Sequence, residues 1–143
     1  MNPNLEIIDF GVSDYEAVLQ YQSSLFNQVI KEKKESGRPK LEYLLIGEHK
    51  PVITLGRHAK EENVLVTEHQ LKERHIDLFN IGRGGDVTYH CPGQLIAYPI
   101  LDLNLHSLGV KDYVAILEEI VIRLLSSFGI KGERIEGATG VWI

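Results

Sequence analysis

Apolar residues recur at helical spacing in two long segments of the chain. The first segment covers residues 15–33 and is followed by Gly37 and Pro39, residue types that end helices. The second covers residues 114–128 and is followed by Gly129. We expect an amphipathic helix in each segment, with one apolar stripe facing the core.

Capping boxes, in which Ser or Thr stands three positions before Glu or Gln, indicate where helices start. Ser13 and Glu16 have this spacing at the start of the first helix. Thr67 and Gln70 repeat the spacing further along the chain. The second pair predicts a short helix that ends near His75.

Short apolar runs outside these helices predict strands. A polar turn at residues 47–51 separates two of the runs, which we expect to pair as a hairpin. Helices mixed with antiparallel hairpins, without strict β-α-β alternation, favour an α+β fold. The expected strands are Leu5–Phe10 (closed by Gly11), Leu41–Ile46, Val52–Leu55, Asn63–Val66 and Ile76–Ile81.

The densest cluster of chemically active residues is the stretch Arg83–Gln94. Gly84 and Gly85 follow an apolar run, so we expect a turn with positive φ at which a ligand approaches the backbone closely. Successive N–H groups of such a turn can hold an anion or a carbonyl oxygen, with the guanidinium of Arg83 beside them.

Residues 86–90 alternate in character, which predicts a strand with two different faces. Pro92 and Gly93 fit the centre of a type II turn, and residues 94–103 would return as the partner strand of a hairpin. On the predicted strand, Val87 and Tyr89 lie on one face, and Thr88 and His90 lie on the other.

The same stretch also has a purely structural interpretation: a tight turn chosen for backbone reasons, with Arg83 in solvent. Cys91 is the only cysteine, which excludes an intrachain disulfide. It is either a small hydrophobic residue or a nucleophile with His90 as its base. Adjacent strand residues point to opposite faces, which argues against the second role.

Composition and charge exclude some classes of function. The net charge of −5 argues against a general nucleic-acid binder. No apolar run has the length of a membrane span, and the N-terminus lacks a signal-peptide pattern, so we expect a cytoplasmic protein. His69, His75 and His106 do not have metal-site spacing. Basic residues cluster at 31–40 and at 57–60, either as solvated faces or as docking sites for an acidic partner.

The stretch Arg83–Gln94 closely resembles the signature of the lipoyl(octanoyl) transferases. That family carries Arg-Gly-Gly-x-x-Thr-Tyr-His followed by Gly-Pro-Gly-Gln, and this chain matches it except that Cys91 stands where the family usually has glycine. Residues 47–57 and 140–143 resemble the family as well. The resemblance therefore spans most of the chain.

The resemblance implies the fold of the lipoate and biotin protein ligases, a mixed and largely antiparallel sheet with packed helices. We expect residues 1–143 to form a single catalytic domain that is incomplete. The implied activity moves an octanoyl group from octanoyl-acyl carrier protein to a lysine of a lipoyl domain, through an acyl-cysteine intermediate. The implied acceptors are the lipoyl domains of 2-oxoacid dehydrogenases and the glycine cleavage H protein, and no cofactor is implied.

The resemblance assigns substrate binding to the residues of the signature. His90 would contact substrate or orient a catalytic lysine. His49 and Arg57 would lie near the active-site cleft without a catalytic role. The predicted substrate-binding residues are Arg83, Gly84, Gly85, Asp86, Val87, Thr88, Tyr89 and His90.

The last residues, Val141-Trp142-Ile143, have the character of the start of a buried strand. We therefore expect that the chain is truncated, and the resemblance places the family's catalytic lysine and cysteine after Ile143. No catalytic residue can be assigned, and we expect little or no transfer by this chain alone.

Two other functions remain open. An ATP-dependent lipoate or biotin protein ligase would share the fold, although the sequence contains no P-loop and Cys91-Pro-Gly-Gln resembles the transferases. A non-catalytic module that binds acyl groups or acyl carrier protein would also lack the catalytic lysine and cysteine.

Overall fold

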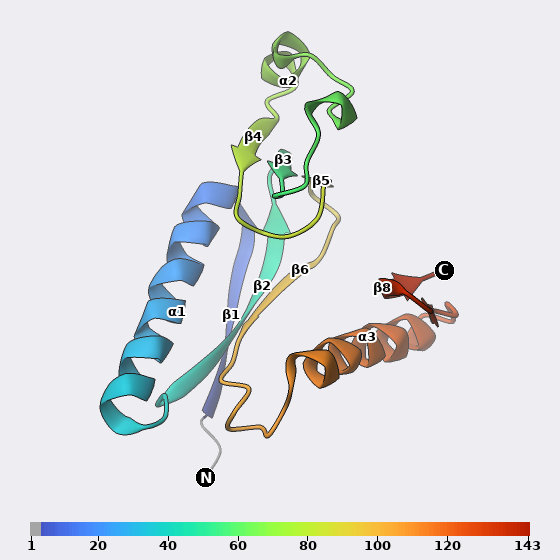
Figure 1. Ribbon diagram of the computed structural model, residues 1–143. Helices are drawn as coiled ribbons and strands as arrows, with labels where there is room; N and C mark the ends of the chain where they lie inside the picture. Colours follow the sequence, from blue (N-terminus) through green and yellow to red (C-terminus); the bar gives the residue numbers. More distant parts are fainter. Residues whose placement is uncertain (1–3) are drawn as a thin grey trace. The chain divides into compact units, whose positions relative to one another are not determined.

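The computed structural model describes residues 4–143, apart from the side chain of Glu61, and divides them into two compact units, 4–101 and 102–143 (Figure 1). Residues 1–3, part of the segment considered for a signal peptide, lie outside the described residues. The first unit contains β1 (Asn4–Ser13), α1 (Tyr15–Ser36), β2 (Leu41–His49), β3 (Val52–Leu55), a 3₁₀ turn (Glu61–Asn63), α2 (Glu68–Glu73), β4 (Asp77–Asn80), β5 (Val87–His90) and β6 (Ile96–Ile100).

One sheet of this unit has the strand order β1-β2-β6, with β1 parallel and β6 antiparallel to β2. Helix α1 runs alongside these strands (Figure 1). Its buried residues Leu25 and Val29 pack with Tyr43, Leu45 and Ile100 of the sheet. Burial of this apolar stripe is the main driving force for docking the helix.

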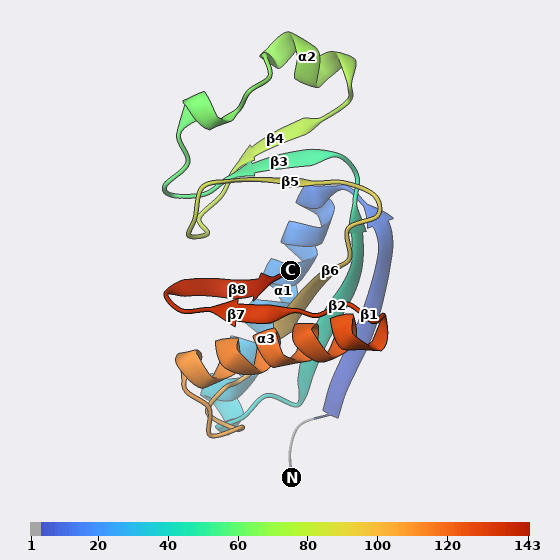
Figure 2. The ribbon, with the colours of Figure 1, turned by 90° about the vertical axis from the view of Figure 1, so that its right-hand side faces the viewer.

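The other sheet has the order β4-β3-β5, with β4 parallel and β5 antiparallel to β3. Figure 2 shows these three strands side by side with α2 beyond them. Ile53 and Leu55 form a second apolar cluster with Leu71 of α2, and Val87 packs against that cluster. The two faces of β5 therefore have different surroundings.

Neither predicted hairpin forms. Strand β2 pairs with β6 and β3 pairs with β5, so the turns at Lys50-Pro51 and at 91–95 each carry the chain from one sheet to the other. Turn chemistry was predicted correctly at the second of these: Gly93 has φ +92° and the Gln94 N–H donates to the Cys91 carbonyl over 3.2 Å. A turn reverses the chain, but the sheets decide which strands pair.

The α+β fold class is confirmed, whereas several local predictions need correction. Strand β1 continues past Gly11 to Ser13, through an irregularity in its pairing. Ser13 is therefore not a helix cap: its hydroxyl donates to the Phe10 carbonyl over 2.6 Å, and Asp14 precedes α1. The predicted strand Asn63–Val66 does not form, because its valines pack into the second cluster from irregular chain.

Other helix boundaries follow the sequence signals. The capping box of Thr67 and Gln70 is present at the start of α2. Helix α1 ends at Gly37, whose N–H donates to the Lys33 carbonyl, and α3 (Val110–Ser127) is followed by Gly129 with φ +73°. In residues 4–143 no helix is both long and apolar enough to cross a membrane.

The second unit packs the hairpin of β7 (Glu133–Ile135) and β8 (Ala138–Trp142) on α3 (Figure 2). Arg134 joins the two elements, since its guanidinium lies 3.0 Å from Glu118 and 3.2 Å from Glu119. The Gly140 N–H also donates to Glu118, over 2.8 Å. The residues that resemble the family at 140–143 thus belong to this hairpin.

Candidate functional site

The diglycine loop, residues 82–86, lies on the segment that leaves β3. A Cβ added to Gly56 would stand 2.4 Å from the Gly85 carbonyl oxygen, so the close contact requires glycine at position 56. Three of the loop's carbonyls bind that segment: those of Arg83, Gly85 and Asp86 accept hydrogen bonds from the backbone N–H groups of Arg57, His58 and Gly56 over 2.9, 3.1 and 3.0 Å.

Arg83 holds the loop to the sheet. Its Nη2 donates to the Thr54 carbonyl over 3.1 Å and to the hydroxyls of Thr54 and Thr88 over 2.9 and 2.6 Å. Its Nη1 donates to the Gly84 carbonyl over 2.9 Å. From the sequence, this guanidinium was predicted to lie beside a bound ligand. In the structure it contacts protein groups, so its direct role toward substrate stays a prediction.

The diglycine backbone remains open. In the described part of the chain, the N–H groups of Gly84 and Gly85 donate to no protein acceptor, and both residues are exposed. A Cβ on Gly84 would meet nothing within 4 Å. Gly85 has φ +85°, a backbone conformation that favours glycine. Because no described acceptor engages them, these N–H groups are available for an anion or a carbonyl oxygen. This cradle remains a prediction.

Asp86 fixes the neighbouring loop. Its Oδ1 accepts the N–H of Lys60 over 3.2 Å, and its Oδ2 accepts from the side-chain amide of Asn63. Asp86 was predicted to bind substrate. The structure shows its carboxylate occupied by these two protein donors.

The alternation predicted for residues 87–90 is present in β5. Val87 packs against the cluster of Ile53 and Leu55. Leu55 also lines a cavity of about 390 Å³, together with Gly56 and Leu78. Tyr89 is about half exposed. The role of Val87 and Tyr89 in lining an acyl channel stays a prediction.

His49 ends β2 and is the buried centre of the bend between the sheets. Its Nδ1 lies 3.3 Å from the Ser13 carbonyl, so Nδ1–H donates and Nε2 accepts from the Tyr98 hydroxyl at 2.8 Å. Phe10 stacks on its ring and Tyr15 meets it edge-on, at centroid distances of 5.5 and 5.2 Å.

Burial lowers the pKa of His49, and repulsion from His90 acts in the same direction although the Ser13 hydrogen bond opposes it. The imidazole is therefore neutral in the folded protein at pH 7. Burial also raises the pKa of Tyr98 to about 12, which keeps its hydroxyl a donor. This structural role of His49 was not predicted from the sequence.

His90 ends β5 next to this centre, with its ring centroid 6.0 Å from that of His49. Its Nδ1 lies 2.6 Å from Oε1 of Gln94, across the turn that leads to β6. The turn is fixed by Glu48, whose Oε2 accepts the Gly93 N–H over 2.7 Å. The sequence predicted that His90 and Gln94 lie close together at the tip of a hairpin. They do lie together, but on a turn between two sheets.

Cys91 follows His90 and is partly buried. Within residues 4–143, no hydrogen bond joins its thiol to His90, whose Nδ1 is bonded to Gln94 instead. A role as nucleophile therefore gains no geometric support. The described residues also contain no cluster of His, Cys, Asp or Glu that could hold a metal ion.

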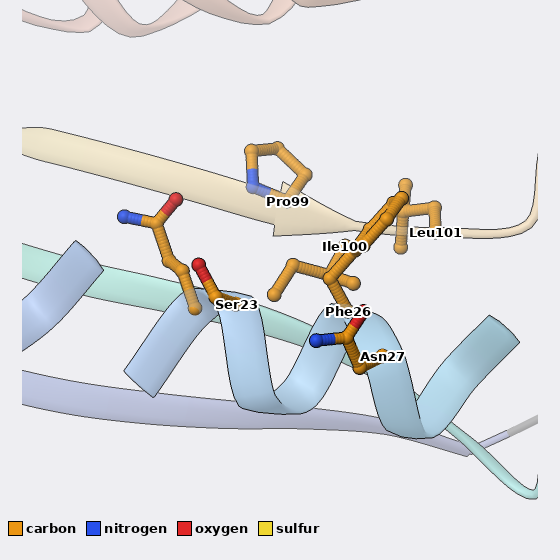
Figure 3. Close-up of a pocket in the computed structure, with 7 residues that line it drawn as sticks. Ser23, Phe26, Asn27, Pro99, Ile100 and Leu101 are labelled. Atoms are coloured by element: carbon orange, nitrogen blue, oxygen red, sulfur yellow. The ribbon is translucent and has the colours of Figure 1, made fainter. Parts of the chain in front are cut away.

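A second cavity, of about 450 Å³, lies between α1 and the end of β6 (Figure 3). Ser23, Phe26 and Asn27 of the helix face Pro99, Ile100 and Leu101 there. This is the end of β6 opposite to the turn at Gln94. It contains none of the predicted site residues.

Residues 14–143 match the model of a protein family described as "Lipoyl protein ligase A/B catalytic domain". The chain belongs to this family. The matched region includes the diglycine loop, the bend at His49 and all the predicted substrate-binding residues.

Among members of this family, the chain is 48% identical over 135 residues to an octanoyltransferase of Porphyromonas gingivalis and 45% identical over 135 residues to one of Parabacteroides distasonis. Each alignment covers 94% of this chain, but only 27% and 61% of those proteins respectively. The chain thus spans less than two thirds of the curated relatives it matches.

The family fold is also found in a solved structure of a T. acidophilum protein with bound lipoic acid. The TM-score is 0.66 at 15% identity, with 99% of this chain and 58% of that chain covered. At this identity the likeness establishes the fold alone.

Proposed function

We propose that this chain is the acyl-binding part of an octanoyltransferase, which moves an octanoyl group from octanoyl-acyl carrier protein to a lysine of a lipoyl domain. The name of the relatives that are 48% and 45% identical supports this reaction. The acceptors would be the lipoyl domains of 2-oxoacid dehydrogenases and the glycine cleavage H protein, in the cytoplasm.

The observation that carries the proposal is the diglycine loop, whose two glycines are exposed and donate their N–H groups to no acceptor among the described residues. Arg83 holds the loop from the side of the sheet, and the loop carbonyls bind the segment after β3. The N–H groups of Gly84 and Gly85, which donate to no acceptor among the described residues, would then serve as donors for the thioester carbonyl oxygen. Thr88 and His90 share the face of β5 that carries the Arg83 contact.

In this reaction a thiolate attacks the thioester carbonyl, the carrier thiol leaves, and the acceptor amine then attacks the acyl-cysteine. None of the described residues is assigned as the attacking thiol or as the group that assists it. We therefore assign residues 83–90 a role in binding and orienting the acyl donor, and no catalytic residue.

Calorimetric titration of the chain with octanoylated and with unloaded acyl carrier protein tests the proposal. We expect the octanoylated carrier to bind at least about tenfold more tightly, a difference of about 1.4 kcal/mol. Equal binding of the two carriers would contradict it. Binding of lipoate only in the presence of ATP would instead favour a ligase.

A further inference from the structure

The hydrogen bond between His90 and Gln94 determines which nitrogen of the His90 ring carries a proton. An amide oxygen can only accept, so the 2.6 Å contact between Nδ1 and Oε1 requires a proton on Nδ1. The neutral ring then has its lone pair on Nε2. Among the described residues Nε2 makes no hydrogen bond.

Gln94 is itself held in place. It closes the turn through its N–H, which donates to the Cys91 carbonyl over 3.2 Å. The residue before it, Gly93, has φ +92° and donates its N–H to Glu48 of β2 over 2.7 Å. The turn that carries the acceptor oxygen is therefore fixed to the same bend as His90.

His49 does not compete for the His90 nitrogens. Both its nitrogens are used, by Ser13 and Tyr98, and its side chain is fully buried. It meets the His90 ring edge-on, at an interplanar angle of 63°. The neighbouring imidazole thus restricts the His90 ring by packing and leaves the choice of tautomer to Gln94.

We propose that Gln94 is a positioning residue that locks His90 in the Nδ1–H tautomer, so that Nε2 presents a lone pair to a hydrogen-bond donor of the substrate. His90 lies on the same face of β5 as Thr88, away from the apolar cluster around Val87. The substrate part of this inference rests on the proposed function. The tautomer itself does not.

Long-range ¹H–¹⁵N correlation spectra of the histidine rings in the uniformly labelled chain measure the tautomer directly. The His90 ring is assigned by the loss of its signals in His90→Gln. In wild type we expect the pyridine-like nitrogen of His90 to be Nε2. An Nε2–H tautomer in the wild type would overturn the proposal without any variant.

Gln94→Met removes the acceptor oxygen and keeps a side chain of similar length. We expect the Nδ1–H preference of His90 to be lost in this variant, and to be retained in Gln94→Glu, because a carboxylate also accepts from Nδ1–H. Gln20→Met, on the exposed face of α1, is the matched control. An unchanged Nδ1–H tautomer in Gln94→Met would contradict the proposal.

The His49 signals report whether a variant is folded, since this ring keeps both hydrogen bonds only in the intact bend. The readout also separates the two proposals. If octanoylated carrier does not bind, the proposed function fails while the tautomer result stands. If the carrier binds but His90 is in the Nε2–H form, the positioning role of Gln94 fails alone.

Discussion

The guanidinium of Arg83 donates a 2.6 Å hydrogen bond to the hydroxyl of Thr88. Both residues belong to the signature stretch, and both would be taken from sequence alone as groups that touch substrate. Their contact instead ties the diglycine loop to β5, with Thr54 of β3 as the further acceptor. Part of the signature is therefore needed to hold the loop in shape.

Removing the Thr88 hydroxyl tests this support. Thr88→Val keeps the β-branched shape but deprives a charged donor of an acceptor, so we expect the free energy of unfolding to fall by about 1–2 kcal/mol. Urea unfolding measures the change. Thr139→Val, at an exposed site on β8, should stay within about 0.5 kcal/mol of wild type. Equal effects of the two substitutions would contradict the assigned support.

Two glycines near the loop provide a matched pair. Gly56→Ala places a methyl group 2.4 Å from the Gly85 carbonyl oxygen, so the backbone has to move. We expect a loss of about 1–3 kcal/mol in unfolding free energy. Gly84→Ala meets nothing within 4 Å and should change stability by less than about 0.5 kcal/mol. The reverse order in thermal or urea unfolding would show that the loop does not lie on Gly56.

Local signals in the sequence predicted the elements better than their pairing. The helical stripe on α1, the Thr67 capping box and the Pro92-Gly93 turn depend on neighbouring residues, and each is present. The partner of a strand depends on distant residues. Both predicted hairpins were wrong for that reason: β2 pairs with β6 and not with β3, and β5 pairs with β3 and not with β6.

For the site, the sequence likewise predicted which residues belong to it but not which groups they contact. The signature located the diglycine loop and His90, but it could not show that Arg83 points into the protein or that Asp86 binds Lys60 and Asn63. His49 was missed as a structural centre, because its partner Tyr98 comes from a strand 49 positions later. Such long-range hydrogen bonds leave no local pattern in the sequence.

Stability should depend on pH through His49. Its pKa is lowered in the fold, so the unfolded chain binds more protons once the pH falls below the ordinary histidine pKa of about 6.5. The contribution is fully present above that pH and is lost as the pH falls toward the folded pKa. Urea midpoints at pH 7.5 and pH 5 measure it.

The variant His49→Gln should show a smaller decrease in the urea midpoint between pH 7.5 and pH 5. Of the titratable groups that face His49, Tyr15 and Tyr98 stay protonated in this range, and His90 is excluded by repeating the comparison in His90→Gln. His69→Gln, at an exposed site on α2, is the control and should behave as wild type. A wild-type dependence unchanged by His49→Gln would refute the assignment.

Cys91 should not accept the acyl group. Its thiol makes no hydrogen bond to His90 within the described chain, and Nδ1 of His90 is bonded to Gln94. Intact-mass measurement after incubation with octanoyl-acyl carrier protein should therefore show no adduct. A thiol-labile octanoyl adduct that disappears in Cys91→Ala would mean that Cys91 is a nucleophile.

We propose that the N–H groups of the exposed residues Gly84 and Gly85 hold the acyl donor. Calorimetric titration of wild type and Gly84→Ala with octanoyl-acyl carrier protein tests this role, because the added methyl group meets nothing within 4 Å in the protein and so leaves room to clash with a ligand. We expect at least about tenfold weaker binding by Gly84→Ala, a loss of about 1.4 kcal/mol, with unchanged stability. Equal affinity of the two proteins would contradict it.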